Sequence, residues 1–489
     1  MSLIDTYSEL DQPKKIIVWV VGFFLIIAMI FGLMALFAKP PEPGVVVDNT
    51  PITLKWRKLF YGQNDLNEVI NGFKTKYPNI TIELETVGPQ EYPTYYSRLI
   101  KDFSLNNPPD IFSINNSDLP AMSQYMSPID YYKGNNLANY MDSFTALPVR
   151  ETMQLNKVYA ITQYVDNIQM YYNTDILTQS GIAIPAKSWD EVVRHAKLIN
   201  KRNTVGEFLQ SVISLGTANN VTRVKEILPI LVMQQGGTIY DWQTQSVGLG
   251  QTRKVDFSGS NLAQQKAGSF VFDPNDRDNP TLDAVRFYTE FANPLSSFYS
   301  WNRQGENSED AFINGKTAYI LHYSYFNDII KARNPNLRFG VASMPQSNDS
   351  NKKTFGNYFM DGMGRHLTQP NGTKDPNITR KRAAAEAFMV YLASKDAQKA
   401  FNARTQTPPA RKDLIEDIKN QNENAYIRIF ADGSLYADNY YRPRVGSDQI
   451  WVKMIEDMQT KSLAVNEAIS DAVNEYQRLI GLGPDVGAI

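Results

Sequence analysis

The chain has 489 residues, of which 43% are hydrophobic and 20% charged, and its formal net charge is −2. The composition is that of a folded protein, and the length is too great for one ordinary core. The lack of a basic excess argues against a nucleic-acid-binding protein. The cysteine count of zero excludes disulfides, thiolate metal sites, cysteine nucleophiles and a lipidated cysteine as a membrane tether.

The first candidate element is the uncharged run 16–38, which follows Lys14 and Lys15. As a helix it would be about 34 Å long, enough to cross the apolar core of a bilayer. The two lysines favour a cytoplasmic N-terminus, with the large remainder exported. A cleavable signal peptide is the alternative, but Leu36-Phe37-Ala38 fails the small-x-small pattern at its first position. We predict a short cytoplasmic segment at 1–15, an uncleaved single-pass anchor at 16–38, and the large part outside the cell.

A linker with four prolines covers residues 39–51 and predicts an extended spacer. Strands and helices then alternate, with strands predicted at 52–56, 80–84 and 110–114 and helices between them. This alternation predicts βαβ units and open, largely parallel α/β sheets. In such sheets ligands bind beyond the carboxyl ends of the strands.

The stretch 155–200 is the most informative part of the chain. It predicts a crossing strand at 159–164, a tyrosine-rich strand at 168–172, and a helix that Ser188 caps. Glu191 stands three residues after Ser188, which is the spacing of a capping box. Two later stretches, 203–220 and 243–268, show weak periodicity, and we interpret them as insertions.

Several short motifs follow one another in a defined order. They are Tyr77-Pro78-Asn79-Ile80, Pro108-Pro109-Asp110-Ile111, the Tyr-Tyr-Asn at 171–173, and the runs 311–319, 340–345, 383–401 and 407–410. In this order they resemble the family 1 extracellular solute-binding proteins of bacterial ABC importers, over roughly residues 52–415. The resemblance implies a two-lobed, periplasmic-binding-protein-like II fold with a hinge and an interlobe cleft. It also implies a sugar or oligosaccharide ligand, an importer permease as partner, no enzymatic activity and no cofactor.

The resemblance further implies that the chain crosses between the lobes more than once, near Tyr164 and near Tyr358. Lobe one would then hold 52–162 and 358–412, and lobe two 166–353 and 413–489.

Sugar sites combine aromatic faces with carboxylates and amides at loop ends. Trp56 ends the first strand, where the family's next loop lines the cleft, although a core tryptophan is the alternative. Three polar candidates follow the strand at 110–114, with a helix cap at Asp118 as the alternative: Asn115, Asn116 and Asp118. Three more stand at the first crossing, where Asp166 could instead pair with an arginine: Tyr164, Asp166 and Asn167.

Six further candidates come from the second half of the chain. Trp301 and Asn302 follow an amphipathic helix, Tyr323 and Tyr325 follow the strand at 318–321, and Tyr358 and Asp361 stand at the second crossing. No metal site is predicted: the run 273–278 lacks the glycine and glutamate of a calcium loop and is interpreted as an acidic turn, and the three histidines lack ligand spacing.

The sequence therefore predicts a membrane-anchored protein that captures a carbohydrate-like solute for an ABC importer. A ligand-sensing or surface-scaffold module on the same fold is the alternative. A glycoside hydrolase would need two carboxylates about 5–9.5 Å apart, for which Asp118 and Asp166 are the candidates. The solute itself stays open, and Arg303 and Arg365 are weak candidates for a phosphate-binding site.

Overall fold

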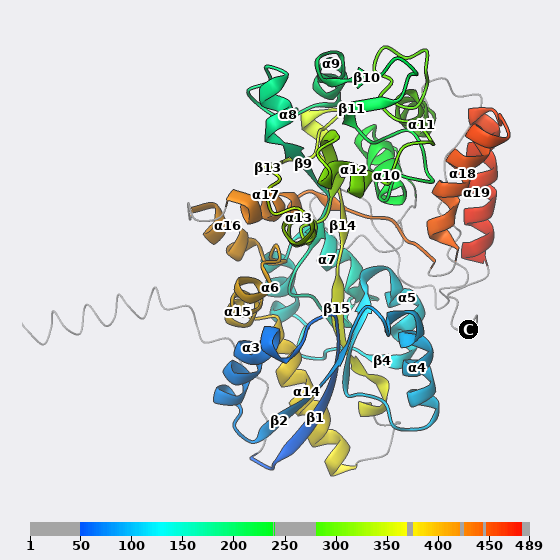
Figure 1. The fold of residues 1–489 in the computed structure, drawn as a ribbon. Helices are drawn as coiled ribbons and strands as arrows, with labels where there is room; N and C mark the ends of the chain where they lie inside the picture. The colour runs from blue at the N-terminus through cyan, green and yellow to red at the C-terminus, as the bar shows by residue number, and fades with distance from the viewer. Residues whose placement is uncertain are drawn as a thin grey trace, which may run out of the picture. The chain divides into compact units, whose positions relative to one another are not determined.

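The computed structural model describes residues 49–237, 239, 280–368, 375–420, 425–443 and 446–481 (Figure 1). The predicted anchor at 16–38, most of its linker, the stretch 243–268 and the acidic turn at 273–278 lie outside these residues. No helix of the described ranges is long and apolar enough to cross a bilayer.

The first sheet has the order β2-β1-β3-β15-β4, with β7 also paired to β15. Its strands are β1 (Ile52–Leu59), β2 (Ile80–Val87), β3 (Ile111–Asn115), β4 (Met126–Ser127), β7 (Ala160–Ile161) and β15 (Phe359–Gly364). β1 runs parallel to β2 and β3, whereas β15 runs antiparallel to β3, β4 and β7.

Helices cover this sheet because each has one apolar face. They are α3 (Gln63–Lys76), α4 (Tyr92–Ser104), α14 (Pro376–Leu392) and α15 (Lys395–Thr405). On α3 the buried residues are Leu66, Val69 and Phe73, at the spacing of one helical face. The Phe73 ring lies 4.8 Å from that of Phe388 on α14, which packs against β1 (Figure 1).

The second sheet has the order β10-β11-β12-β9-β13. Its strands are β9 (Gln169–Asn173), β10 (Lys201–Arg202), β11 (Phe208–Ile213), β12 (Thr317–His322) and β13 (Phe339–Ala342). β11 and β12 are parallel, and β9 is antiparallel to both β12 and β13. β11 lies within the stretch 203–220, which was interpreted as an insertion, and it pairs with β12 as a strand of this sheet. Its alternation was obscured because Leu209, near the sheet edge, is 59% exposed.

The helices around the second sheet come from three separate parts of the chain. They are α8 (Thr174–Gln179), α9 (Trp189–Ile199), α10 (Val224–Gln234), α11 (Pro280–Glu290), α12 (Ser308–Ile313), α13 (Phe326–Arg333), α17 (Ala425–Ser434), α18 (Ser447–Thr460) and α19 (Val465–Gly481). Ser188 caps α9 by accepting from the Glu191 amide, and the Glu191 carboxylate accepts from the amide of Lys187, one residue earlier than the predicted box requires.

A small third sheet, β16-β14-β8, lies in the segments that connect the two larger ones. It consists of β8 (Asp166–Asn167), β14 (Thr354–Asn357) and β16 (Ala437–Asp438). The chain passes from the first sheet to the second through β8 and returns through β14 into β15. Since β8 and β14 pair antiparallel, with Asp166 opposite Asn357, the two passages are hydrogen-bonded to each other.

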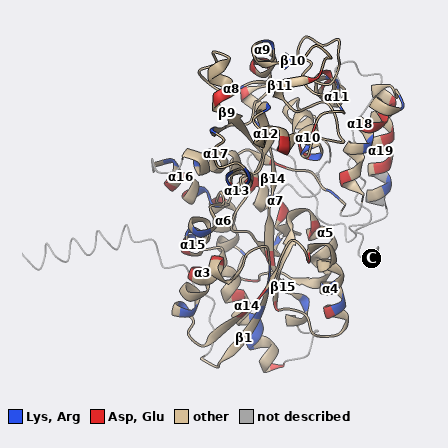
Figure 2. Ribbon diagram, viewed as in Figure 1, with Lys and Arg blue, Asp and Glu red and all other residues tan. Residues whose placement is uncertain are grey.

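Each large sheet has its own apolar core. One core takes buried residues between Leu54 and Val165 and again between Tyr358 and Ala410. The other takes residues between Ile168 and Phe355 together with the C-terminal helices. The remaining short elements are α5 (Leu119–Met122), α6 (Asn135–Ser143), α7 (Ala146–Glu151), β5 (Met153–Gln154), β6 (Lys157–Val158) and α16 (Lys412–Asn420). Acidic and basic residues are interspersed over the described elements (Figure 2).

Candidate functional site

One cleft is lined by residues that follow strands of both large sheets. It consists of two cavities of about 600 and 510 Å³ that share Tyr323, Tyr325, Asn357 and Phe359. Residues after β1, β3 and β12 contribute to its walls, at the carboxyl ends of those parallel strands. We call the larger cavity the aromatic end and the smaller one the polar end.

The aromatic end is lined by rings from five separate segments. They are Phe60, Tyr61, Tyr164, Tyr323, Tyr325, Phe359 and Tyr426. The Tyr323 and Tyr325 rings stack with centroids 6.0 Å apart, and Tyr325 is 46% exposed, so part of its side chain is open to a ligand. Exposed aromatic faces of this kind suit the C–H surface of a sugar ring.

Phe60 stands out in its backbone. Its φ of 66° is positive, a region in which a bulky side chain is strained. The Phe60 N–H donates to the Val87 carbonyl at 2.8 Å, and the ring contacts the Phe359 ring at 4.9 Å. The surrounding structure thus holds the ring at the cleft against its own backbone preference, which is a feature of functional sites.

Asp166 supplies a carboxylate to the aromatic end. Its Oδ1 accepts from the backbone N–H of Ser324 at 3.0 Å and from that of Asn167 at 2.9 Å. No arginine, lysine or histidine of the described residues lies within 4.0 Å of it, so the alternative of an arginine pair is wrong. Burial raises the pKa of Asp166 to about 7, although the two amides oppose the shift.

The polar end contains six charged side chains: Asp118, Arg223, Lys225, Glu226, Arg442 and Asp448. The Arg223 guanidinium lies over the rings of Tyr323 and Tyr325, with its carbon 5.3 and 5.8 Å from their centroids. It pairs with Glu226 at 3.4 Å, while Lys225 pairs with Asp448. Burial raises the pKa of Glu226, and the charge of Arg223 opposes the shift.

The residues after β3 divide between the cleft and the interior. Asn115 and Asp118 line the polar end. Asn115 Nδ2 donates to Asn357 Oδ1 at 3.0 Å, which connects the first sheet to β14. Asp118 accepts from the Tyr96 hydroxyl and does not cap α5 with its side chain. Asn116 points away from the cleft and donates to Glu151 Oε2 at 2.7 Å.

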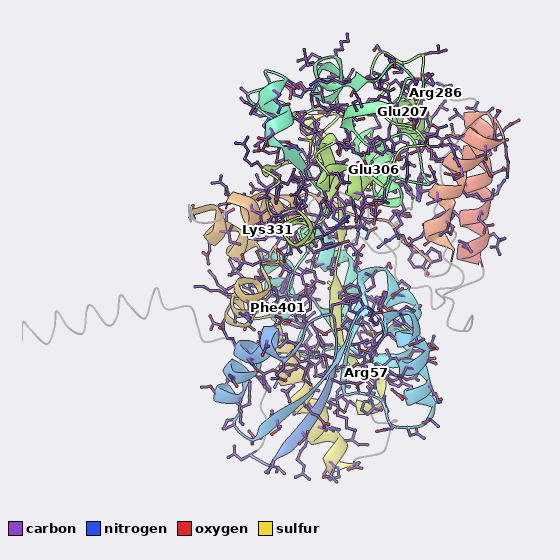
Figure 3. The ribbon with its side chains drawn as sticks, in the orientation of Figure 1. Arg57, Glu207, Arg286, Glu306, Lys331 and Phe401 are labelled. Atoms are coloured by element: carbon purple, nitrogen blue, oxygen red, sulfur yellow. The ribbon has the colours of Figure 1, made fainter. Side chains whose placement is uncertain are left out.

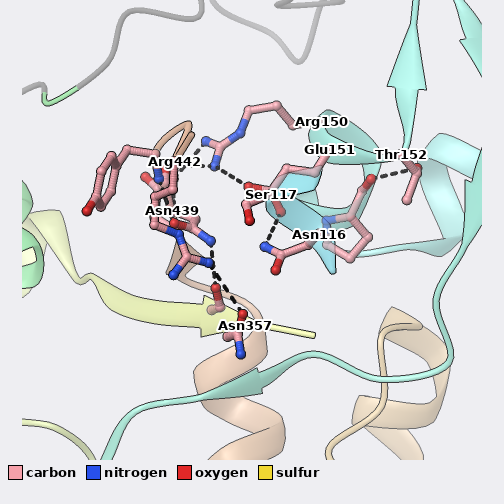
Figure 4. Close-up of polar contacts among 12 residues, drawn as sticks. Asn116, Ser117, Arg150, Glu151, Thr152, Asn357, Asn439 and Arg442 are labelled. Atoms are coloured by element: carbon pink, nitrogen blue, oxygen red, sulfur yellow. Dashed lines mark hydrogen bonds and ion pairs between the residues drawn. The ribbon is translucent and has the colours of Figure 1, made fainter. Parts of the chain in front are cut away.

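A buried polar network supports this end of the cleft from behind (Figure 4). Glu151 accepts from Asn116 and, at 2.9 Å, from the Tyr358 hydroxyl, and burial raises its pKa. Arg150 pairs with Asp438 at 2.7 Å and donates to the Asn439 carbonyl. Burial opposes ionisation of Asp438, but Arg150 and Lys353 lower its pKa to about 2.

Seven predicted site residues do not line the cleft: Trp56, Asn116, Asn167, Trp301, Asn302, Tyr358 and Asp361. Trp56 is 1% exposed and donates to Asp361 Oδ1 at 3.1 Å, and Asp361 is itself fully buried in an ion pair with Lys58. Asn116 and Tyr358 belong to the Glu151 network described above. Asn167 is fully buried and donates to the Phe430 carbonyl at 2.8 Å. Trp56 is therefore a core tryptophan, which was the alternative to a cleft residue.

Trp301 lies in the second core, and Asn302 lies in the turn that follows it. Trp301 is 4% exposed, and its indole N–H donates to Asn220 Oδ1 at 3.1 Å, so no ring face is available for stacking. Asn302 Oδ1 accepts from the amides of Gln304 and Gly305, which makes it a turn residue. Trp301 was predicted to contact the ligand, but its loop folds back onto the core.

The structure adds cleft residues that the sequence did not single out, notably Tyr92, Tyr96, Arg223, Asn357, Thr405, Tyr426 and Arg442. For Asn357 and Phe359 a signal existed, since they flank Tyr358. Neighbouring strand residues face opposite sides, so choosing Tyr358 selected the wrong side of the chain. For Arg442 and Tyr426 no local pattern pointed to the cleft.

The cleft offers aromatic rings, carboxylates, amides and guanidinium groups to a ligand. Asp118 and Asp166 line different ends of the cleft, and each is bound to its own donors. Within the described ranges, no group of three histidine, aspartate or glutamate side chains could hold a metal ion.

The protein thus has two helix-covered sheets, a small sheet that connects them, and one cleft that residues of both large sheets line. This architecture is that of a two-sheet α/β binding protein. The family model of the bacterial extracellular solute-binding proteins matches residues 61–399, and the chain belongs to that family.

Similar proteins agree with this assignment. A binding protein of Brucella abortus (strain 2308) is 22% identical over 294 residues, which cover 59% of this chain and 61% of that relative's length. A cyclic alpha-maltosyl-1,6-maltose binding protein of Arthrobacter globiformis has a TM-score of 0.65 at 14% identity, covering 88% of this chain and all of that one. The sugar-binding protein MalE of Xanthomonas citri has a TM-score of 0.65 at 16% identity, covering 88% and 98%.

Proposed function

We propose that this protein captures a carbohydrate in the cleft, outside the cell, and delivers it to an ABC importer permease. The observation that carries the proposal is the aromatic end, where stacked tyrosine faces lie beside the Asp166 carboxylate. Sugar recognition needs this combination, because ring faces contact the C–H surface and carboxylates accept from hydroxyls. The structural neighbours that are named for maltose and other sugars support it.

The two large sheets are proposed as the cores of two lobes, 52–162 with 358–412 and 166–353 with 413–489. A ligand in the cleft touches groups from both, such as Phe60 on one side and Tyr325 on the other. Because such a ligand gains contacts when the lobes approach, it would favour a closed state. The hinge would be the paired strands β8 and β14.

The run 16–38 is proposed as an uncleaved anchor that tethers the binding domain to the outer face of the membrane. The proposed role is non-enzymatic, since binding, closure and release require no covalent step.

Isothermal titration of the protein with a panel of mono- and oligosaccharides tests the binding proposal. We expect at least one saccharide to bind and Tyr325→Ala to weaken it about tenfold or more, since stacked aromatic contacts contribute on the order of 1 kcal/mol beyond the area they bury. Tyr131→Ala is the matched control, because Tyr131 does not line the cleft. Absence of saccharide binding, or equal losses in both variants, would contradict the proposal.

Co-purification tests the partner. Recovery of a multi-span permease with the full chain from native membranes supports import. Recovery of a sensor protein or of surface polymers in its place would favour the sensing or scaffold module.

A further inference from the structure

We propose that the polar end of the cleft binds an anionic group of the solute through Arg442, so that the preferred ligand is an acidic saccharide. This inference rests on the proposed carbohydrate-binding function and specifies its ligand class. It starts from the pairing of the charged groups that line this end.

Five of the six charged side chains at the polar end have a partner within the protein. Arg223 pairs with Glu226, Lys225 pairs with Asp448, and Asp118 accepts from the Tyr96 hydroxyl. Each of these carboxylates is thus already matched by a cation or a hydroxyl donor.

Arg442 is the exception among the described residues. No carboxylate there lies within 4.0 Å of its guanidinium, and its one hydrogen bond runs from Nη2 to Asn357 Oδ1 at 3.4 Å (Figure 4). Its Nε is buried and has no acceptor. A guanidinium has five N–H donors in a planar fork, so most of the donor capacity of Arg442 is unused.

Arg442 is positioned by a ring contact and by a single hydrogen bond, which leave its other N–H donors unused. The guanidinium carbon lies 5.1 Å from the centroid of the Phe355 ring, which supports one face of the group. Asn357, its hydrogen-bond acceptor, also accepts from Asn115 at 3.0 Å and shares the cleft floor with Phe359. Arg442 therefore lines the polar end beside Asn357, which both ends of the cleft share.

An oxyanion is the group that best completes this site. A carboxylate or phosphate accepts two parallel N–H bonds from a guanidinium, and such charge-assisted bonds are about twice as strong as neutral ones. A sugar hydroxyl would fill one donor at a time. The aromatic end would hold the sugar ring, while the acidic substituent of the sugar reaches Arg442.

The experiment compares matched ligands by isothermal titration of the full chain in detergent. The probes are glucose, galactose and their disaccharides, the corresponding uronic acids, and the 6-phosphates. We expect an acidic member to bind roughly tenfold or more tightly than its neutral partner, with the preference falling as salt is raised. The uronate and phosphate arms identify which oxyanion is preferred.

Two variants assign that preference to Arg442. Arg442→Gln should remove most of the difference between acidic and neutral members, while Arg442→Lys should retain part of it because the charge remains. Arg286→Gln changes an exposed arginine on α11, outside the cleft, and should leave the ratio unchanged. The ratio of two affinities in one variant is insensitive to partial loss of folded protein.

The possible results distinguish the proposed preference for an acidic saccharide from the proposed binding of saccharides in general. If neutral saccharides bind as tightly as acidic ones, or Arg442→Gln weakens both equally, the anionic preference is wrong while saccharide binding stands. If no saccharide binds, both proposals fail.

Discussion

The stability of the fold depends on pH through Asp166, a residue that is 8% exposed and whose carboxylate accepts from the backbone amides of Ser324 and Asn167. Its folded pKa of about 7 lies above the usual aspartate pKa of 3.8, so the folded state binds the proton more tightly than the unfolded one. The stabilisation from this proton is complete below about pH 4 and is lost as pH rises through 7.

We expect Asp166→Asn to unfold at a higher temperature than the wild type at pH 8, because the amide retains the Oδ1 acceptor without a charge. The advantage should shrink towards pH 5, by about 2–3 kcal/mol at most. Calorimetry at pH 5, 6.5 and 8 measures it. A difference that stays constant across this range would show that Asp166 is ionised throughout.

Lys58 and Asp361 form a fully buried ion pair at 2.5 Å, where a ligand contact at Asp361 was predicted. Lys58 Nζ also lies 5.6 Å from the ring of Phe401. Phe401 belongs to α15 and is labelled in Figure 3. Lys58→Met would leave a carboxylate buried without its counter-charge, at a cost of about 3–5 kcal/mol. Chemical denaturation measures this loss of unfolding free energy.

The double variant Lys58→Met/Asp361→Asn should recover part of that loss, because it removes the uncompensated charge. Arg333→Ala is the control: it breaks an ion pair with Asp310 whose side chains are 47% and 42% exposed. Such pairs contribute about 1 kcal/mol or less. Equal losses in the buried and exposed cases would contradict the role of burial.

Whether a residue lines the cleft could be predicted where its position at the end of a strand decides it. Tyr164, Asp166, Tyr323 and Tyr325 follow from the ends of strands, and all four line the cleft. The prediction failed where a shift of one residue along a strand, or the path of a loop, decides whether a side chain lines the cleft or is buried. Trp56 lies inside the first sheet and Phe60, four residues later, reaches the cleft, a distinction that needs the strand's actual end at Leu59.

At the scale of elements, the packing of α17 on β8 depends on Gly433. A Cβ there would lie 2.1 Å from Asn167 Oδ1 and 2.1 Å from Gln169 Nε2. These two side chains are buried and hydrogen-bonded to each other at 2.6 Å, so neither can move away without losing a bond. Gly433→Ala gains about 1 kcal/mol of helix propensity, but the overpacking outweighs it.

We expect Gly433→Ala to lower the free energy of unfolding by about 1–3 kcal/mol. Gly88→Ala is the matched control, because a Cβ at that position meets nothing nearer than Glu91 Oε2 at 3.9 Å. Urea denaturation of both variants tests the difference. If Gly433→Ala were the more stable of the two, α17 would not be packed against β8 in solution.

Elements with long, regular patterns could be predicted, and short ones could not. The helix after Ser188 has a cap and a continuous apolar face, and α9 begins at Trp189 as the cap requires. β8 has two residues and β14 four, and their pairing is a long-range contact between parts of the chain about 190 residues apart. No local pattern encodes such a contact, so the connecting sheet was missed.

On the scale of the whole molecule, the cleft is complete only when both sheets contribute, so ligand binding should change their spacing. We expect a bound saccharide to lower the radius of gyration measured by small-angle X-ray scattering. Tyr325→Ala, measured at the same ligand concentration, should give a smaller decrease because less ligand is bound. A radius of gyration that does not change at saturating ligand concentration would show that the cleft is already closed without ligand.

The proposed anchor determines where this binding domain works. Placing two charges in the apolar run, with Leu25→Arg and Ile27→Arg together, would cost about 5–7 kcal/mol of membrane insertion. We expect the unaltered chain to stay in the membrane fraction after an alkaline carbonate wash and the double variant to leave it. Leu295→Arg is the control, because that side chain is 94% exposed and lies outside the run. Mass spectrometry of the washed membranes gives the decisive reading, since a mature N-terminus near residue 39 would mean that the run is a cleaved signal.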